Sequence, residues 1–218
     1  LYSIQQEDVS GSFTIVGNTS RNFDDSYFVK LFPDDCIDLT YDVVDYNDFV
    51  YEINTNTTWN NSKTVLGEVR VKSGNILTIS GATTEIKFAD NKKTGTNTKI
   101  VVEKNAKLVI NDATLTNDDR CPNSIWEGIT LLGDNQWSQS PLSHPYHQAK
   151  LELNNATIDN VMYAISYGEG NWSDFGALVE AENSTIRVVR RAIAFMSYPF
   201  FNNSTFKQCT FEYASSVT

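Results

Sequence analysis

The sequence predicts an all-β protein of the right-handed parallel β-helix class, a solenoid in which each coil adds a strand to the same sheets. Three observations favour this class. A short strand–turn–strand pattern recurs along the chain, turn-forming residues recur at one place in it, and a second set of similar strands lies between the copies. Repeats of this length that pair with their neighbours are typical of solenoids. With 218 residues and 40% hydrophobic residues, the chain has the composition of a folded protein.

The first repeat consists of two short strands separated by a bend. Residues 69–83 align without a gap with residues 100–114, and shorter copies follow at 151–158, 179–186 and 204–211. The threonines that mark the five copies are 31, 43, 28 and 25 residues apart: Thr83, Thr114, Thr157, Thr185 and Thr210. Within each copy a small residue, a threonine and a large residue follow one another. This is the period-2 alternation of a β-strand.

The alternation assigns the residues on either side of each threonine to the interior. One predicted interior column holds small residues: Ala82, Ala113, Ala156, Ser184 and Cys209. The other holds mostly large apolar residues: Thr84, Leu115, Ile158, Ile186 and Phe211. The threonines are expected on the opposite face.

A column of turn-forming residues precedes these pairs: Gly81, Asp112, Asn155, Asn183 and Gln208. Gly, Asn and Asp adopt the left-handed backbone conformation with little strain, so this column predicts a tight bend between two strands. Gln208 departs from the pattern, and we expect its bend to be looser.

A second set of strands lies between the copies, at residues 128–131, 164–167 and 192–195, with isoleucines 36 and 28 residues apart. Each coil is therefore expected to carry at least two strands, with the insertions confined to one connection. An antiparallel sandwich is the alternative fold, but it does not require one residue class to recur at one phase. Right-handed winding follows from the general rule for parallel crossover connections.

The run from Thr58-Trp59 through 71–79 and 100–116 to Trp126-Glu127-Gly128-Ile129 resembles secreted β-helix proteins of Bacteroidetes. The resemblance covers about residues 57–218. It implies a secreted or cell-surface protein, associated with the outer membrane and exported by the type IX secretion system. That route uses a C-terminal sorting domain, which this sequence does not contain.

Residues 1–55 do not follow the repeat. They contain four strand-like runs, at 13–16, 27–31, 37–44 and 49–53. We interpret 1–55 as a β-rich N-terminal module or cap, and 56–218 as the β-helix. Because a solenoid needs a polar lid at each end, we expect the C-terminal end to be covered by further coils of the same protein or by another chain.

The net charge, the apolar runs and the cysteines limit the kinds of partner and the cellular compartment that we expect. A net charge of −10 argues against a nucleic-acid partner, and no apolar run approaches the about 20 residues needed to cross a bilayer. The chain begins at Leu1 without a recognisable targeting segment, so we expect a removed leader or an interior piece of a longer protein. Three cysteines leave at least one unpaired within the chain, and a Cys36–Cys121 bridge is an option in an oxidising compartment.

Three insertions follow the strands of the second set and share one phase, so they are expected on one edge of neighbouring coils. They carry the residues that we select as the ligand- or partner-binding site: Trp137, Tyr146, Trp172, Phe175, Tyr198 and Phe200. Such an aromatic strip suits stacking on sugar rings or an apolar patch of a partner protein. The alternative is that the rings pack on one another and hold the long loops down.

Metal binding has weaker support. His144 and His147 lie three residues apart in a loop with no further zinc ligand indicated by spacing. The carboxylates between Asp24 and Asp48, and those at Asp118 and Asp119, lack a calcium-loop spacing. We therefore expect solvated loops and no cofactor, with calcium as the one ion left open.

For catalysis, β-helix enzymes use carboxylates, or carboxylates with a basic residue, on adjacent coils. Glu152 and Glu180 share a phase, but no basic residue appears in register with them, and Arg187 is expected to offset Glu180 or Glu182. We therefore expect a non-catalytic structural or adhesive segment that displays aromatic loops to a glycan or a protein. The alternative is a β-helix carbohydrate-active enzyme, a polysaccharide lyase or glycoside hydrolase.

Overall fold

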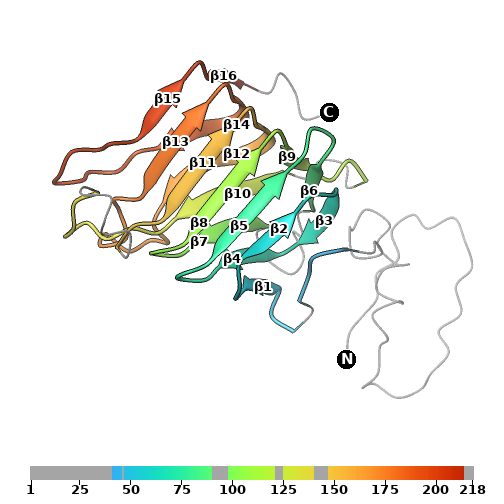
Figure 1. The fold of residues 1–218 in the computed structure, drawn as a ribbon, viewed down its shortest axis with the longest axis horizontal. Helices are drawn as coiled ribbons and strands as arrows, with labels where there is room; N and C mark the ends of the chain where they lie inside the picture. The colour runs from blue at the N-terminus through green and yellow to red at the C-terminus, as the bar shows by residue number, and fades with distance from the viewer. Residues whose placement is uncertain (1–40, 46, 90–97, 121–124, 140–146, 214–218) are drawn as a thin grey trace, which may run out of the picture.

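The computed structural model describes residues 41–45, 47–89, 98–120, 125–139 and 147–213. These residues form an all-β fold in which every strand pair is parallel, and the strands lie in two curled sheets (Figure 1). This arrangement is consistent with a parallel β-solenoid. The coils stack along the molecule from β1–β3 at the lower right of Figure 1 to β15 and β16 at the upper left.

The strands form three parallel ladders, which the chain visits in a fixed order. Ladder 1 contains β1 (Val50–Ile53), β4 (Glu68–Val71), β7 (Lys99–Val102), β10 (Trp126–Leu131) and the second halves of β12 (Thr157–Tyr167) and β14 (Thr185–Ala194). Ladder 2 contains β2 (Thr57–Trp59), β5 (Ile76–Ser80), β8 (Lys107–Asn111), β11 (Lys150–Asn154), β13 (Leu178–Glu182) and β15 (Thr205–Lys207). Ladder 3 contains β3 (Lys63–Leu66), β6 (Glu85–Ala89), β9 (Thr114–Asn117), the first halves of β12 and β14, and β16 (Thr210–Tyr213).

The strand register confirms most of the predicted columns. Thr157 pairs with Thr114 and with Thr185, which pairs with Thr210, and Ile129, Ile165 and Ile193 pair in the same way. The gapless alignment of the first two copies is wrong at one place. Glu85, not Thr83, pairs with Thr114, because the bend after β5 is two residues longer than the bend after β8. Ile86 therefore occupies the interior position predicted for Thr84.

The turn column shares the left-handed backbone conformation at its four non-glycine positions. The φ angles are 55° at Asp112, 51° at Asn155, 50° at Asn183 and 52° at Gln208, whereas Gly81 has a φ of 123°. The expectation of a looser bend at Gln208 is wrong, since its backbone matches the others. The turns are linked along the stack by side chains, because Asn155 Nδ2 donates to Asp112 Oδ1 at 2.7 Å and Asn154 Nδ2 donates to Asn111 Oδ1 at 2.8 Å.

The core lies between the ladders and is built of stacked apolar columns. Leu77, Leu108 and Leu151 pair in register and are fully buried. Trp126 is also fully buried, stacks on Phe88 with ring centroids 4.2 Å apart, and donates from Nε1 to the Asp159 carbonyl at 3.0 Å.

Gly128, two residues further along the same Trp-x-Gly-Ile motif, lies against the neighbouring backbone. A Cβ atom there would be 1.7 Å from the Tyr163 carbonyl oxygen. The motif therefore combines a large core side chain, that of Trp126, with a close approach of the β10 and β12 backbones at Gly128.

The connections differ from the prediction in one respect. Long connections join ladder 1 to ladder 2 after β10, β12 and β14, as expected, but residues 90–98 and 118–125 lengthen a second connection, between ladders 3 and 1. Residues of the predicted N-terminal module or cap contact the first coils, since β1 pairs with β4 and Val43 forms a bridge with Val65. The other predicted features of the module at 1–40 lie outside the described residues.

Candidate functional site

Three loops lie at the edge of the stack where ladder 1 passes to ladder 2. Loop A follows β10 (residues 132–149), loop B follows β12 (168–177) and loop C follows β14 (195–204). The backbones of loops A and B are bonded to each other, because Gly133 N donates to Asp174 O at 2.7 Å and Asn135 N donates to Ser173 O at 3.0 Å. Loop C joins them through the Tyr198 hydroxyl, which donates to the Trp137 carbonyl. The predicted placement of the three insertions side by side is therefore confirmed for the parts that the structure describes.

Two buried glutamines hold the loops in place. Gln148 Nε2 donates to the carbonyls of Asp134 and Trp137, both at 2.9 Å, and Gln148 Oε1 accepts from Asp134 N at 3.0 Å. Gln139 Nε2 donates to Gly176 O at 2.8 Å and to Ala177 O at 3.0 Å, while its Oε1 accepts from Asn203 N at 2.6 Å. Gln139 therefore joins all three loops, and fully bonded buried amides of this kind make a surface rigid.

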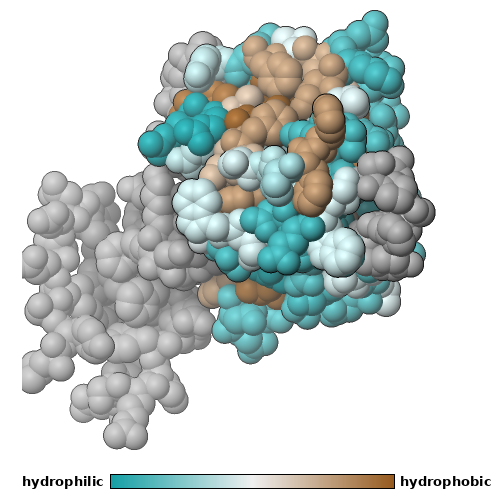
Figure 2. All heavy atoms as spheres, turned by 90° about the vertical axis from the view of Figure 1, so that its left-hand side faces the viewer, coloured by the Kyte–Doolittle hydropathy of each residue, from teal (hydrophilic) through white to brown (hydrophobic). Residues whose placement is uncertain are grey.

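Four exposed aromatic residues lie on this rigid edge. Their exposed fractions are 52% at Trp137, 71% at Trp172, 42% at Phe200 and 89% at Phe201. Figure 2 views the molecule from the left-hand side of Figure 1 and shows hydrophobic side chains gathered in the upper half of this face. We call Trp137, Trp172, Phe200 and Phe201 the aromatic surface.

Part of the predicted strip has another role. Phe175 is buried, with 6% exposure, and its ring meets Trp172 edge-on with centroids 5.8 Å apart. Tyr198 is half-buried and donates from its hydroxyl to the Trp137 carbonyl at 2.5 Å. Both side chains support the loops, as the alternative interpretation expected. Tyr146 lies outside the described residues.

Trp137 stacks on His147, with ring centroids 4.2 Å apart and planes 2° from parallel. One face of the Trp137 ring is thus covered from within loop A. His147 has a packing role here, and His144 lies outside the described residues. The stack orients the indole ring, and the residue stays 52% exposed.

Loop B is also held by ion pairs to ladder 1. Glu169 binds Lys99 at 2.8 Å and Arg70 at 3.0 Å, and Arg70 reaches Glu68 on the same face. Burial opposes the ionised form of Glu169, but the hydrogen bonds from Lys99 and Arg70 outweigh it and lower the pKa of the carboxyl group. Loop B is therefore fixed at its first turn as well as at its tip.

A small cavity of about 10 Å³ lies beneath the loops, lined by residues that include Gln139, Tyr167 and Tyr198. Among the described residues, the Tyr167 hydroxyl has no hydrogen-bond partner of normal geometry. Burial raises the pKa of Tyr167 to about 12, and the nearby Ser204 side chain opposes this shift. The cavity has room for about one water molecule.

A second, polar groove of about 560 Å³ lies on the outer face of ladder 2, over β11, β13 and β15. Glu152 and Glu180 pair in register there, as predicted. As predicted, no basic residue lies in their register row, which continues to Val109 and Thr205, but two lysines outside that row contact them. Lys150 Nζ lies 2.8 Å from Glu152 and 2.9 Å from Glu180, and Lys107 Nζ lies 2.9 Å from Glu152.

Glu152 and Lys150 are stabilised in their ionised forms. Burial opposes the charge on Glu152, but hydrogen bonds from Lys150 and Lys107 lower the pKa of its carboxyl group. Burial likewise opposes the charge on Lys150, while Glu152 and Glu180 raise the pKa of its amine. A general acid needs a raised carboxyl pKa and a lysine base needs a lowered one, so these shifts oppose proton transfer at neutral pH.

Arg187 also has partners other than those predicted. Its guanidinium binds Asp159 at 2.5 Å and Glu212 at 2.9 Å, and not Glu180 or Glu182. Asp159 and Glu212 lie on the outer face of ladder 3, so Arg187 links three coils. This cluster joins the last strands to the stack.

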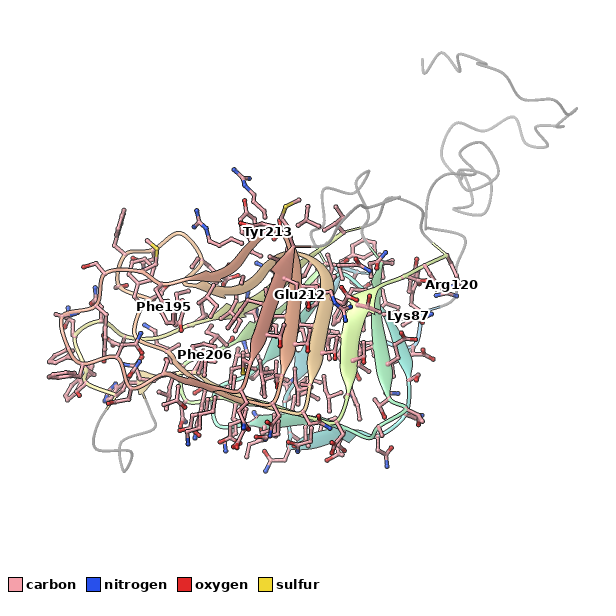
Figure 3. All side chains as sticks on the ribbon, turned by 90° about the horizontal axis from the view of Figure 1, so that it is seen from above. Lys87, Arg120, Phe195, Phe206, Glu212 and Tyr213 are labelled. Atoms are coloured by element: carbon pink, nitrogen blue, oxygen red, sulfur yellow. The ribbon has the colours of Figure 1, made fainter. Side chains whose placement is uncertain are left out.

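The calcium candidates from Asp24 to Asp38 lie outside the described residues, and those that the structure describes accept hydrogen bonds or form ion pairs locally. Asp42 accepts from Thr64 N at 2.7 Å, and Asp48 accepts from Val50 N at 3.0 Å. Asp118 is fully buried and binds Arg120 at 2.6 Å, while Asp119 binds Lys87 at 2.9 Å; Lys87 and Arg120 are labelled in Figure 3. In the part of the chain that the structure describes, no three His, Cys, Asp or Glu side chains are placed to hold a metal ion.

Sequence reasoning missed Gln139, Gln148 and Glu169, which fix the loops. Gln139 and Gln148 both belong to loop A, but a glutamine in a polar loop carries no sequence signal of burial. Phe201 stood next to the selected Phe200 and is the most exposed ring of the group. Cys209 is a free thiol, and the Cys36–Cys121 pair lies outside the described residues.

Comparison of the chain with protein-family models, with curated proteins and with solved structures finds no match. The family resemblance drawn from the repeat residues therefore stays a prediction. No helix within the described ranges is long and apolar enough to cross a membrane.

Proposed function

We propose that this protein is a non-catalytic, secreted or cell-surface β-solenoid segment whose aromatic surface binds a glycan. The observation that carries the proposal is the exposure of Trp137, Trp172 and Phe201 on loops that buried glutamines cross-link. A ring held in place loses little conformational entropy on binding, and indole faces suit stacking on the apolar faces of sugars. Phe200 extends the same surface on loop C.

Further parts of the proposal follow from the repeat and the resemblance. The coils wind with a right hand, by the general rule for parallel crossovers. The protein reaches the cell exterior, associated with the outer membrane, as cargo of a type IX secretion system or as part of a larger surface assembly. The stack acts as a stiff spacer, and the loops as its contact surface.

A glycan array tests the binding, with the 218-residue chain and three variants. Trp172→Ala and Phe201→Ala are expected to lower the affinity for any bound glycan about tenfold each, which corresponds to about 1.4 kcal/mol. Tyr51→Ala is the matched control, because Tyr51 is an exposed ring on β1, away from the loops, and its loss should change nothing. If no glycan binds, or all three variants bind equally, the proposal is wrong. Binding of a protein in place of a glycan would be the other outcome expected from an apolar surface.

The alternative function, a carbohydrate-active enzyme, has one observation in its favour. Glu152 and Glu180 line a groove on adjacent coils with Lys150 between them. The pKa shifts of Glu152 and Lys150 favour a structural ion-pair cluster. A reducing-end assay on the polysaccharides that bind would separate the two functions, since release of product that Glu152→Gln abolishes would support the enzyme.

A further inference from the structure

The three loops that carry the aromatic surface contain no residue with a permanent positive charge. All 17 Lys and Arg of the chain lie outside loops A, B and C, whereas Asp134, Glu169 and Asp174 lie within them. A surface that binds a carboxylated or sulfated ligand needs cations to receive the charge. The charges around the rings therefore limit the class of ligand that they accept.

The cations that contact the loops from the neighbouring strands and turns are already paired. Lys99 and Arg70 bind the Glu169 carboxylate at 2.8 and 3.0 Å, and Lys104 Nζ lies 3.2 Å from Asp174 Oδ1. These pairs neutralise the two carboxylates of loop B. Among the described residues, no cation of this group is left over for an anionic ligand.

Two further arginines lie away from the loops. Arg191 pairs in register with Tyr163, and Arg190 donates to the Tyr163 hydroxyl at 2.7 Å. This pairing places both arginines where β14 enters ladder 1. Loop C begins at residue 195, four residues further along the strand, which is about 13 Å away at the usual rise of a β-strand.

Asp134 leaves one negative charge on the loops without a cation. Its Oδ1 accepts from Gln136 N at 3.0 Å, in the turn that leads to Trp137, and it forms no ion pair within the described residues. The charge reaches loop C as well. Burial raises the pKa of Tyr198, and the Asp134 carboxylate adds to this rise, against the effect of a backbone hydrogen bond at Gln139.

Uncharged amide side chains flank the aromatic surface in all three loops: Gln136 in loop A, Asn171 in loop B and Asn203 in loop C. All three residues are exposed. Figure 2 shows hydrophilic residues bordering the hydrophobic ones on this face. An amide carries both hydrogen-bond donors and an acceptor, so it can bind a sugar hydroxyl in either sense without a charge.

We propose that the aromatic surface selects neutral glycans and excludes polysaccharides that carry carboxylate or sulfate groups. The inference rests on the proposed glycan binding and names the class of glycan. A neutral sugar can stack on the rings and bind the amides. An anionic sugar there meets the Asp134 carboxylate with no cation to offset it, within the reach of about 8 Å that charge repulsion has at physiological ionic strength.

The test compares matched pairs of hexasaccharides built from glucose, mannose or galactose. One member of each pair is neutral, and in the other the C6 hydroxymethyl groups are oxidised to carboxylates. Isothermal titration calorimetry with the 218-residue protein at pH 8 measures both affinities, because histidine is ordinarily uncharged at this pH. Only binding that Trp172→Ala weakens is counted, since this ring belongs to the aromatic surface.

The neutral member should bind at least tenfold more tightly than its oxidised partner. An oxidised member that binds as tightly as the neutral one, or more tightly, would overturn this inference and leave glycan binding by the loops standing. If no member of any pair binds, the inference and the proposed function are both wrong.

Two changes test whether charge causes the preference. Raising NaCl from 50 to 500 mM should reduce the affinity ratio of the neutral to the oxidised member at least threefold, because salt screens the repulsion. Asp134→Asn should reduce it about threefold, and asparagine keeps an acceptor for Gln136 N. Glu85→Gln removes the same charge on β6, in ladder 3, and should leave the ratio unchanged. A ratio that neither salt nor Asp134→Asn alters would overturn the proposal.

Discussion

Replacing Gly128 by alanine should disrupt the contact between β10 and β12 more than any other single-methyl change in the described coils. Gly128 has a φ of +115°, and an added Cβ would lie 1.7 Å from the Tyr163 carbonyl oxygen and 2.8 Å from its carbon. The closest favourable approach of a carbon to a carbonyl oxygen is about 3.3 Å. The overlap is with backbone, so no side-chain rotation relieves it.

The cost has two parts. Holding an alanine at this φ costs about 1–3 kcal/mol, because L-residues rarely adopt it. Separating the strands enough to admit the methyl group would also break about two ladder hydrogen bonds, at about 1 kcal/mol each. The expected loss of unfolding free energy is therefore about 3–5 kcal/mol, a large share of the 5–15 kcal/mol typical of a domain.

Urea unfolding followed by tryptophan fluorescence measures this loss, since Trp126 is buried two residues away. Gly170→Ala is the matched control. Gly170 also has a positive φ, of +85°, but no heavy atom lies within 4 Å of the added Cβ, so only the backbone term of about 1–2 kcal/mol applies. If the two variants lost the same stability within about 0.5 kcal/mol, the close strand approach at Gly128 would not be a determinant of the fold.

Three further changes test the core, the turns and the buried phenol. Leu108→Ala, in the centre of a fully buried column, should cost about 3–5 kcal/mol in the same urea assay, and a loss under 1 kcal/mol would contradict the stacked core. Asn155→Ala should lower the free energy of unfolding by about 1–2 kcal/mol, and Asn155→Gly should lower it less. Both variants lose the hydrogen bond to Asp112, but glycine adopts the left-handed turn without strain. The reverse order would refute the turn assignment. Tyr167 has a pKa of about 12 in the folded protein and about 10 in the unfolded chain. Its contribution to the free energy of unfolding is therefore present below pH 10 and falls by about 1.4 kcal/mol per pH unit between pH 10 and pH 12. Tyr167→Phe should remove that fall, which urea midpoints measured across this pH range would detect.

Much of the fold can be predicted from the sequence because each coil repeats the local chemistry of the one before it. The threonine and isoleucine columns and the left-handed turns all follow from residue type at a fixed phase. The two-residue shift at Thr83 escapes such reasoning, since Gly81-Ala82-Thr83 looks like Asp112-Ala113-Thr114 although its bend is longer. Gln208 shows the converse, as the surrounding hydrogen bonds impose a backbone that glutamine rarely adopts.

The site is harder to predict, because its determinants are contacts between coils and between loops. Lys150 lies two residues before Glu152, so both point to the same face of β11, yet a search along one register row does not find this pair. The bonds of Gln139 depend on where three insertions meet, which the repeat does not encode. The positions of the loops are therefore predictable, whereas the division into exposed rings, such as Trp172, and supporting rings, such as Phe175, is not.

The division between ladders and loops has a consequence for how the protein moves. Each strand pairs with the strands of its own ladder in the preceding and the following coil. Unfolding can therefore begin in one coil and advance to the next while the remaining coils stay folded. Amide protons of a central strand such as β8 would then stay protected while a neighbouring coil opens and exchanges with solvent.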